Sequence, residues 1–201
     1  MSGRTAIAPA RDAASIRMAA AALAAGHLVV IPTDTVYGLA ADPRVSGAEE
    51  RLRAAKGREP RKPIPILAAD ASAVAAAGFA MDEVERRLAA LWPGPLTIVL
   101  RKAGATEGIR VPDHPVARSV IGECGGLLRV TSANRSGEEP ARTAAEAEAA
   151  LGARVAVILD DGPSPGGTPS TVVRVDDGRI VILREGAITR ETLEKTARGA
   201  R

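Results

Sequence analysis

The chain has 201 residues, 46 % of them hydrophobic, which is enough to bury the core of one globular domain. Its 27 basic and 24 acidic residues give a net charge of only +3, and no apolar run approaches the roughly 18 residues that a membrane helix needs. A membrane-spanning protein is therefore excluded, and because Cys124 is the only cysteine, so are an internal disulfide and a cysteine-based zinc site.

Short strands alternate with helices along the first third of the chain. The Ala-rich stretch 11–26 is predicted to be a helix that ends at a glycine, and a β-branched strand follows over 27–32. A second helix is predicted over 46–57, with Ser46 and Glu49 as a capping box. This helix leads directly into a basic loop.

The same alternation continues to the C-terminal part of the chain. Thr143 and Glu146 predict a second capping box, and Asp177-Gly178 is a pair favoured in the tight turn of a hairpin. The alternation predicts an α/β fold, a β-sheet covered by helices, within a single domain over residues 1–201. Strands are predicted over 63–68, 96–101, 127–131, 155–160, 170–175 and 179–183, and helices over 81–92, 115–126 and 143–152.

The positive charge is concentrated in one stretch. Residues 51–62 hold six basic residues and one acidic residue, whereas the rest of the chain has 21 basic and 23 acidic residues. Local basicity of this kind favours an anionic ligand, either a phosphate group or a nucleic acid. A solvated helix face followed by a surface loop is the alternative interpretation.

The common catalytic signatures are absent. The sequence has no Walker-type phosphate loop, no dinucleotide-binding glycine motif and no nucleophile elbow, and its two histidines, His27 and His114, do not have metal-ligand spacing. Polar loops at the ends of predicted strands remain, and in open α/β sheets ligands bind at such ends. We therefore predict a cleft for a phosphorylated ligand and a polar, zwitterionic companion. The loops contain Thr33 and Thr35, then Thr131, Ser132 and Asn134, and then Thr168, Ser170 and Thr171.

Seven segments occur in a recognisable order between residues 13 and 187: "IPTDTVYGLAAD", "AKGREPRKP", "LWPGPLTIVL", "RVPDHP", "TSANRSGEEPART", "GGTPSTVV" and "LREGA". In this order and spacing they resemble the YrdC/Sua5 family, the threonylcarbamoyl-AMP synthases. The resemblance implies a twisted mixed β-sheet flanked by helices, with a concave basic cleft. It is closest to the short single-domain form, with residues 188–201 as a C-terminal tail.

The resemblance also implies an activity. A member of this family is a nucleotidyltransferase, an L-threonylcarbamoyladenylate synthase that converts L-threonine, bicarbonate and ATP into threonylcarbamoyl-AMP and pyrophosphate. The product serves the t6A modification at position 37 of tRNA, and we expect its hand-over to a threonylcarbamoyl-transferase complex. Mg²⁺ is expected to enter with ATP, without a protein metal site. The N-terminal stretch lacks the layout of a secretion signal, so we expect a cytoplasmic protein.

Site residues follow from the motifs that are present. The K-x-R pair, Lys56 and Arg58, is expected to face the ATP phosphates and to be catalytic, and we expect its loss to leave the fold intact. Leu67 stands where a histidine often approaches the amino acid, so that role is not transferred. The expected ATP-binding residues are Lys56, Arg58, Thr106, Ser132, Asn134, Thr143 and Arg184, and the expected L-threonine-binding residues are Thr33, Arg110 and Ser170.

Two alternatives stay open from the sequence. The basic stretch also suits a non-enzymatic protein that binds tRNA or double-stranded RNA, or a ribosome-maturation factor. One Trp, one Tyr and one Phe provide little for stacking on bases, although a direct tRNA contact through phosphates remains an alternative. A relative with the same fold that acts on another carbamoyl substrate is the second alternative.

Overall fold

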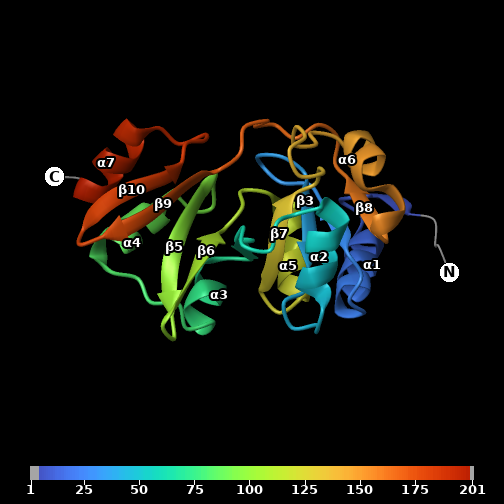
Figure 1. The fold of residues 1–201 in the computed structure, drawn as a ribbon, viewed down its shortest axis with the longest axis horizontal. Coiled ribbons are helices and arrows are strands. Elements are labelled where there is room, and N and C mark those ends of the chain that lie inside the picture. The colour runs from blue at the N-terminus through green and yellow to red at the C-terminus, as the bar shows by residue number, and fades with distance from the viewer. Residues whose placement is uncertain (1–4, 200–201) are drawn as a thin grey trace.

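The computed structural model describes residues 5–199, which form ten strands and seven α-helices (Figure 1). The strands are β1 (Ala6–Pro9), β2 (Val29–Ile31), β3 (Gly38–Ala41), β4 (Ile66–Ala68), β5 (Leu96–Lys102), β6 (Ala105–Arg110), β7 (Leu127–Ser132), β8 (Val157–Asp160), β9 (Thr171–Asp176) and β10 (Arg179–Arg184). The α-helices are α1 (Ala13–Ala24), α2 (Ala48–Lys56), α3 (Ala71–Ala76), α4 (Glu83–Leu88), α5 (Pro115–Glu123), α6 (Ala144–Leu151) and α7 (Arg190–Arg198). Two short 3₁₀ turns, η1 (Ala89–Leu91) and η2 (Gly152–Arg154), follow α4 and α6.

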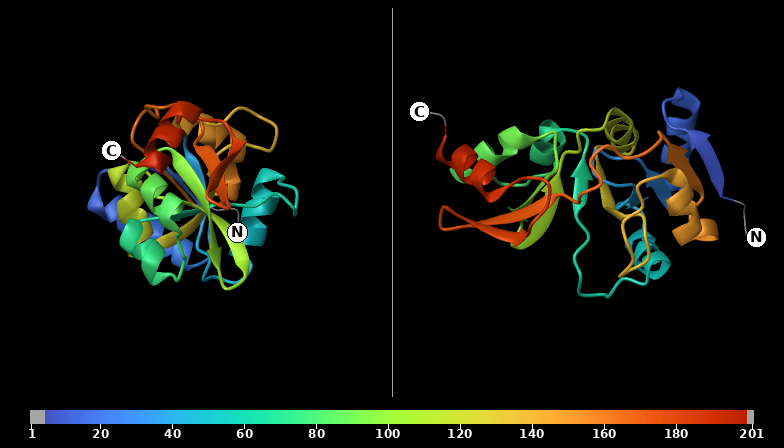
Figure 2. Two further views of the ribbon diagram at one scale, coloured as in Figure 1. Left: turned by 90° about the vertical axis from the view of Figure 1, so that its left-hand side faces the viewer. Right: turned by 90° about the horizontal axis from the view of Figure 1, so that it is seen from above.

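All ten strands pair into one sheet, in the order β1-β8-β2-β3-β7-β4-β6-β5-β9-β10. Four of the pairs are parallel, namely β1–β8, β2–β8, β4–β6 and β5–β9, and the other five are antiparallel. The two further views in Figure 2 show the sheet twisting along its length, with helices on its faces. The predicted mixed, twisted sheet flanked by helices is thus confirmed.

Helices cover the sheet in three groups, each with its own apolar core. Helices α1 and α5 pack on one face of the half that holds β1, β2, β3, β7 and β8, and α2 and α6 pack on the other face of that half. Helices α4 and α7 cover the half that holds β5, β6, β9 and β10. Burial of apolar side chains in these groups supplies most of the driving force for folding. Representative fully buried side chains are Leu23 of α1, Ile121 of α5, Leu52 of α2, Leu151 of α6, Leu88 of α4 and Leu193 of α7.

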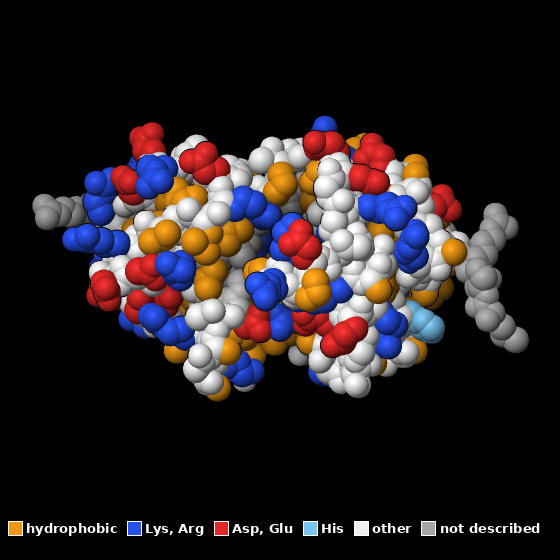
Figure 3. All heavy atoms as spheres, in the orientation of Figure 1, with side chains coloured by type: hydrophobic (Ala, Val, Ile, Leu, Met, Phe, Trp, Pro, Cys, Tyr) orange, Lys and Arg blue, Asp and Glu red, His pale blue; other side chains and the backbone are white. Residues whose placement is uncertain are grey.

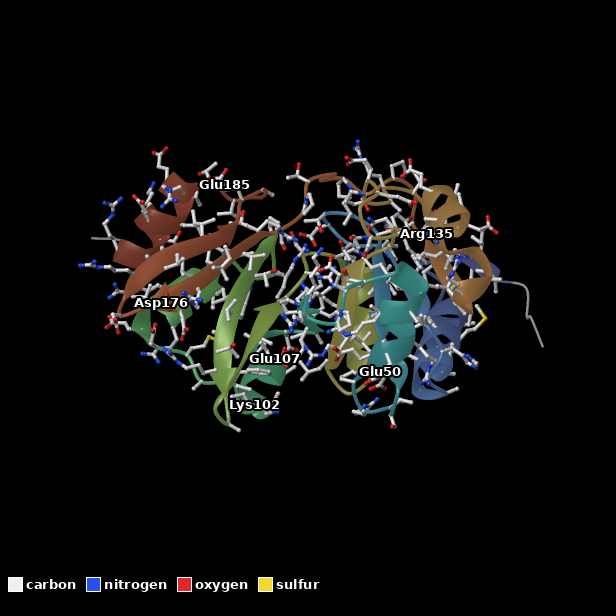
Figure 4. All side chains as sticks on the ribbon, viewed as in Figure 1. Glu50, Lys102, Glu107, Arg135, Asp176 and Glu185 are labelled. Atoms are coloured by element: carbon white, nitrogen blue, oxygen red, sulfur yellow. The ribbon has the colours of Figure 1, made fainter. Side chains whose placement is uncertain are left out.

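A charged cross-link joins the two halves near the middle of the sheet. Arg129 of β7 donates two hydrogen bonds to the carboxylate of Glu107 on β6, both at 2.6 Å, and its Nε lies 3.2 Å from Glu49 of α2. Glu107 is labelled in Figure 4, where side chains from both halves converge between β6 and β7. The pair fixes β6 and β7 on either side of the short strand β4.

The predicted helix caps are only partly correct. Helix α2 begins after Gly47, which has a left-handed φ of 73°, and no side chain caps it, so the capping box from Ser46 is wrong. Glu49 instead accepts from Arg53, one turn along the same helix. At α6 only half of the predicted capping box is present: the hydroxyl of Thr143 accepts from the backbone N–H of Glu146, but the Glu146 carboxylate accepts from the N–H of Arg142 and not from that of Thr143.

The hairpin around Asp177-Gly178 is confirmed, because β9 and β10 pair antiparallel and both turn residues have positive φ. Beyond it, the segment expected to be a tail contains helix α7, with Leu193 fully buried, and residues 200–201 lie outside the described part of the chain. The strands β1, β3 and β6 and the helix α3 were not predicted from the sequence.

Gly186, which follows β10, lies unusually close to the backbone of residues 169–171. A Cβ built on Gly186 would lie 2.4 Å from the carbonyl oxygen of Pro169 and 2.5 Å from the carbonyl carbon of Ser170. These neighbours are backbone atoms, which no side-chain rotation can move away. Only glycine therefore allows this approach.

We predict that Gly186→Ala lowers the free energy of unfolding by about 1 to 3 kcal/mol, the usual range for overpacking. Gly122→Ala in helix α5 is the matched control, because a Cβ there meets nothing within 4 Å. It should be neutral or stabilise by about 0.5 to 1 kcal/mol, as alanine is the better helix former. Urea unfolding of both variants measures the difference, and equal stabilities would contradict the backbone clash.

Candidate active site

A cavity of about 140 Å³ lies where the two halves of the sheet meet. An adjoining cavity of about 480 Å³ shares four of its lining residues and extends over β5, β6 and β9. Figure 3 shows basic side chains around a hollow near the middle of this face. Together these spaces reach the size typical of small-molecule sites. The first cavity is lined by six of the predicted site residues, Thr33, Arg58, Arg110, Ser132, Ser170 and Arg184, and the four residues shared by both are Arg58, Pro65, Thr97 and Arg184.

The loop between β2 and β3 forms one wall of the first cavity. The hydroxyl of Thr33 accepts from the backbone N–H groups of Thr35 and Val36 and donates to the carbonyl oxygen of Val36, at 2.6 Å. Thr33 and Thr35 are both buried, with their hydroxyl oxygens 3.0 Å apart. The Thr33 hydroxyl therefore holds the loop in a tight turn that presents this pair to the cavity.

Arg110, at the end of β6, is buried at the centre of this wall. Its guanidinium donates to Asp34 at 2.5 Å, to the hydroxyl of Thr35 at 2.9 Å and to the carbonyl oxygen of Gly94 at 3.0 Å. Burial lowers the pKa of Arg110, and the Asp34 carboxylate opposes this effect. These contacts use three of the five guanidinium N–H groups, which leaves two for a ligand. Asp34 is a site residue that sequence reasoning missed.

Lys56, the last residue of α2, is buried and only 3 % exposed. Its ammonium group donates to the carbonyl oxygens of Ser132 and Asn134, at 2.6 and 2.7 Å, and to the side-chain oxygen of Asn134, at 2.8 Å. Burial lowers the pKa of Lys56 to about 8, and the charge of Arg58 adds to this. The three N–H groups of the ammonium therefore point at oxygen atoms of the protein, and Lys56 lines neither cavity. This position differs from the expected place at the phosphates.

Arg58 and Arg184 differ from Arg110 in having no carboxylate partner within 4 Å among the described residues. Arg58 is held by the carbonyl oxygen of Pro63 at 2.8 Å, and Arg184 by the carbonyl oxygen of Ser170 at 2.8 Å. Burial lowers the pKa of Arg58, and the charges of Arg53 and Arg184 lower it further. Two cations without counter-ions beside one cavity favour an anionic ligand.

The other predicted residues take different positions. Ser132 lines the first cavity, whereas the amide group of Asn134 donates to the carbonyl oxygens of Arg135 and Glu138 and so shapes a turn. Thr106 is exposed and lines the second cavity. Thr143 caps helix α6 and lines neither cavity. Leu67 pairs with Arg110 between β4 and β6 and contributes an apolar side chain to the wall.

Thr97 on β5 is a second site residue that the sequence did not reveal, and unlike Asp34 it lines both cavities. It is only 3 % exposed, and its hydroxyl oxygen lies 2.9 Å from that of Ser170. The available signal was a lone hydroxyl within the apolar strand "LTIVL".

Between residues 5 and 199, no cluster of three or more His, Cys, Asp or Glu side chains is placed to hold a metal ion. Within the same range, no helix combines the length and the apolar character needed to cross a bilayer. The residues lining the two cavities include three arginines besides the rim cations Lys62 and Arg174, and no Asp or Glu.

Comparison with known proteins decides the family. The family model Sua5/YciO/YrdC, which carries the description "telomere recombination", matches residues 21–186. The chain belongs to the Sua5/YciO/YrdC family. A threonylcarbamoyl-AMP synthase of Chromohalobacter salexigens is 39 % identical over 172 residues, covering 80 % of this chain and 92 % of that protein. The Bacillus subtilis enzyme of the same name is 38 % identical over 192 residues, covering 89 % of this chain and 55 % of that protein.

A solved structure of the family agrees with the fold described above. P. abyssi Sua5 complexed with L-threonine superposes with a TM-score of 0.86 at 29 % identity, covering 96 % of this chain and 60 % of that one. The chain thus spans little more than half the length of the longer Sua5 and B. subtilis proteins and nearly the whole of the C. salexigens protein.

We predict that Lys56→Met lowers the free energy of unfolding by about 2 to 4 kcal/mol, because it leaves several buried oxygens of the Ser132 to Asn134 turn without a donor. Lys62→Met is the matched control, since Lys62 forms an exposed pair with Glu59 and should change stability by less than about 0.5 kcal/mol. Urea unfolding compares the two variants. A Lys56→Met variant as stable as the control would show that these hydrogen bonds contribute nothing.

Proposed function

We propose that the chain is a threonylcarbamoyl-AMP synthase that converts L-threonine, bicarbonate and ATP into threonylcarbamoyl-AMP and pyrophosphate. The observation that carries the proposal is the cavity itself. Its lining includes two cations without counter-ions, Arg58 and Arg184, and several hydroxyls. It also includes Arg110, which keeps two of its five N–H groups free for a ligand. The curated relatives of this family that bear the name threonylcarbamoyl-AMP synthase support it.

The reaction brings anions together. The threonine nitrogen forms a bond to the carbon of bicarbonate and water leaves, which yields an N-carboxylate. An oxygen of this carboxylate then attacks the α-phosphorus of ATP, and pyrophosphate departs with the electrons of the broken P–O bond. Positioning and charge neutralisation are what such a step needs most.

The described residues can share this work. The two remaining N–H groups of Arg110 suit the α-carboxylate of threonine, and the guanidinium of Arg58 offers a planar fork to phosphate oxygens. Arg184 reaches the same cavity from the end of β10. Lys56 contributes indirectly, because its ammonium group holds the turn that places Ser132 at the cavity.

Mg²⁺ accompanies ATP in this proposal. The lining of the cavities offers hydroxyls and arginines without a carboxylate, so the phosphate oxygens themselves would be its principal ligands. When bound, the ion neutralises phosphate charge. Arg58, whose guanidinium faces both cavities, supplies the protein's part of that neutralisation.

The RNA-binding alternative is not favoured. Tyr37, Phe79 and Trp92, the only aromatic residues of these types, are all buried, and Trp92 donates its indole N–H to the carbonyl oxygen of Leu96. No such side chain is available to stack on a base. Use of the product for tRNA modification, and its hand-over to a transferase complex in the cytoplasm, belong to the proposed function.

We predict that Arg58→Ala lowers threonine- and bicarbonate-dependent pyrophosphate release about 30- to 1000-fold, as expected when a charge-assisted contact in the transition state is lost. Arg58→Lys should recover little of this, because a point charge does not reproduce the fork. Arg61→Ala is the matched control, since it removes an exposed charge from the same loop and lines neither cavity. Circular dichroism checks folding, and a folded Arg58→Ala variant with near wild-type turnover would remove Arg58 from the site.

Substrate choice gives a separate test. A site that hydrogen-bonds the β-hydroxyl of threonine leaves polar groups unpaired when valine binds, so we predict a much higher rate of pyrophosphate release with threonine than with valine. The comparison uses wild-type protein, ATP and bicarbonate at fixed concentrations. Equal rates with the two amino acids would overturn the proposed function.

A further inference from the structure

Thr97, Ser170 and Arg184 form a hydrogen-bonded chain along the boundary between the two cavities. The hydroxyl oxygens of Thr97 and Ser170 lie 2.9 Å apart, and Arg184 Nη2 donates to the Ser170 hydroxyl at 3.0 Å. Thr97 comes from β5, Ser170 from the loop before β9, and Arg184 from the end of β10. All three side chains line the first cavity.

The tertiary structure makes specific room for the Thr97 side chain. A Cβ built on Gly108 of the paired strand β6 would lie 3.2 Å from the Thr97 methyl group and 3.5 Å from Cβ of Pro65. Any larger residue at position 108 would push against Thr97. The glycine therefore allows the threonine hydroxyl to stay beside Ser170.

The donors and acceptors among Thr97, Ser170 and Arg184 can be counted. An arginine only donates, so the Ser170 oxygen accepts from Arg184. One of the two hydroxyls then donates to the other, which consumes one of their two protons. Whichever hydroxyl donates, the remaining proton belongs to a buried group, 3 % or 5 % exposed, that lines the first cavity. The pair therefore presents one O–H donor to a ligand.

The charge beside the pair indicates what this donor meets. Arg184 makes its hydrogen bonds to Ser170 alone and has no carboxylate partner among residues 5–199. A cation without a counter-ion next to a single donor favours an oxygen acceptor with negative charge. A hydrogen bond from Arg184 also polarises the Ser170 hydroxyl, which strengthens it as a donor.

We infer that Thr97 is a specificity-determining residue that works with Ser170 as one O–H donor for an anionic oxygen of the amino-acid substrate. This inference rests on the proposed function. The hydroxyl of Thr97 forms this pair with Ser170, so its hydroxyl matters while its methyl group does not. The effect falls on recognition of the amino acid and leaves ATP binding largely unchanged.

A double-mutant cycle tests the inference through the KM values for L-threonine and ATP. Thr97→Val should raise the KM for L-threonine roughly 3- to 10-fold, the scale of one hydrogen bond, and leave the KM for ATP within about twofold. Thr97→Ser should behave like the wild type. Because the two hydroxyls act as a unit, Thr97→Val combined with Ser170→Ala should bind no worse than Ser170→Ala alone.

Thr171→Val is the matched control, because Thr171 is equally buried but its hydroxyl bonds to the backbone of Ile188 and lines neither cavity. It should lower stability and leave the KM for L-threonine unchanged. An unchanged KM in Thr97→Val, additive effects in the double variant, or an equal rise in Thr171→Val would each overturn the inference.

Calorimetric titration with L-threonine separates this inference from the proposed function. If the wild type binds threonine and Thr97→Val binds it equally well, only the role of Thr97 is refuted. If the wild type neither binds threonine nor releases pyrophosphate with it, the proposed function is refuted and the inference falls with it. Weaker binding by Thr97→Val, restored in Thr97→Ser, supports both.

Discussion

The buried ammonium group of Lys56 is the contact on which the geometry of the site depends. It joins the end of helix α2 to the turn after β7, two segments that are 76 to 78 residues apart in the sequence. Because the ammonium has three donors and the turn offers several inward-facing oxygens, the arrangement satisfies both partners without water. The turn that carries Ser132 and the loop that carries Arg58 are thereby held next to each other.

The arginines near the cavity fall into two groups, those with a carboxylate partner and those without one. Arg110 and Arg129 are paired with Asp34 and Glu107, and they link the loops and strands of the two halves. Arg58 and Arg184 lack such partners and face the cavities. A paired buried charge contributes to a defined conformation, whereas Arg58, which is half-buried, and Arg184, which is exposed, keep their charge free to pair with an anion. The second group is therefore where binding energy from an anionic ligand is available.

Close backbone approach is the other requirement of the site. Gly186 allows the segment after β10 to lie against the backbone of Pro169 and Ser170, and Gly166 does the same for the carbonyl oxygen of Asp34. The N–H of Gly167 also donates to the carbonyl oxygen of Thr35 at 2.8 Å. These contacts bring the β8–β9 loop over the β2–β3 loop, so that hydroxyls from both loops share one cavity. A rigid arrangement of this kind lowers the entropy lost on binding.

The sequence by itself determined the fold class, most of the longer elements, the hairpin at Asp177-Gly178 and the concentration of charge in residues 51–62. These features depend on local periodicity, turn chemistry and composition, which are written in neighbouring residues. The motifs also led to Arg58, Arg110 and Ser170 as parts of one site, and the structure brings these three together. The strands β1, β3 and β6 were missed because their four to six residues show no alternation of apolar and polar side chains.

Only the tertiary structure decided how each side chain is used. The sequence predicts that Lys56 faces phosphate groups, but in the structure it is a buried donor to distant carbonyl oxygens. Asp34 and Thr97 gain their roles from partners 76 and 73 residues away. The capping box predicted at Ser46 was wrong for a similar reason. The backbone at Gly47 is left-handed and Glu49 accepts a hydrogen bond from Arg53, so the local sequence pattern does not decide how this helix begins. Hydrogen-bond partners are set by which strands lie side by side, and strand order is a property of the whole sheet that no short stretch of sequence contains.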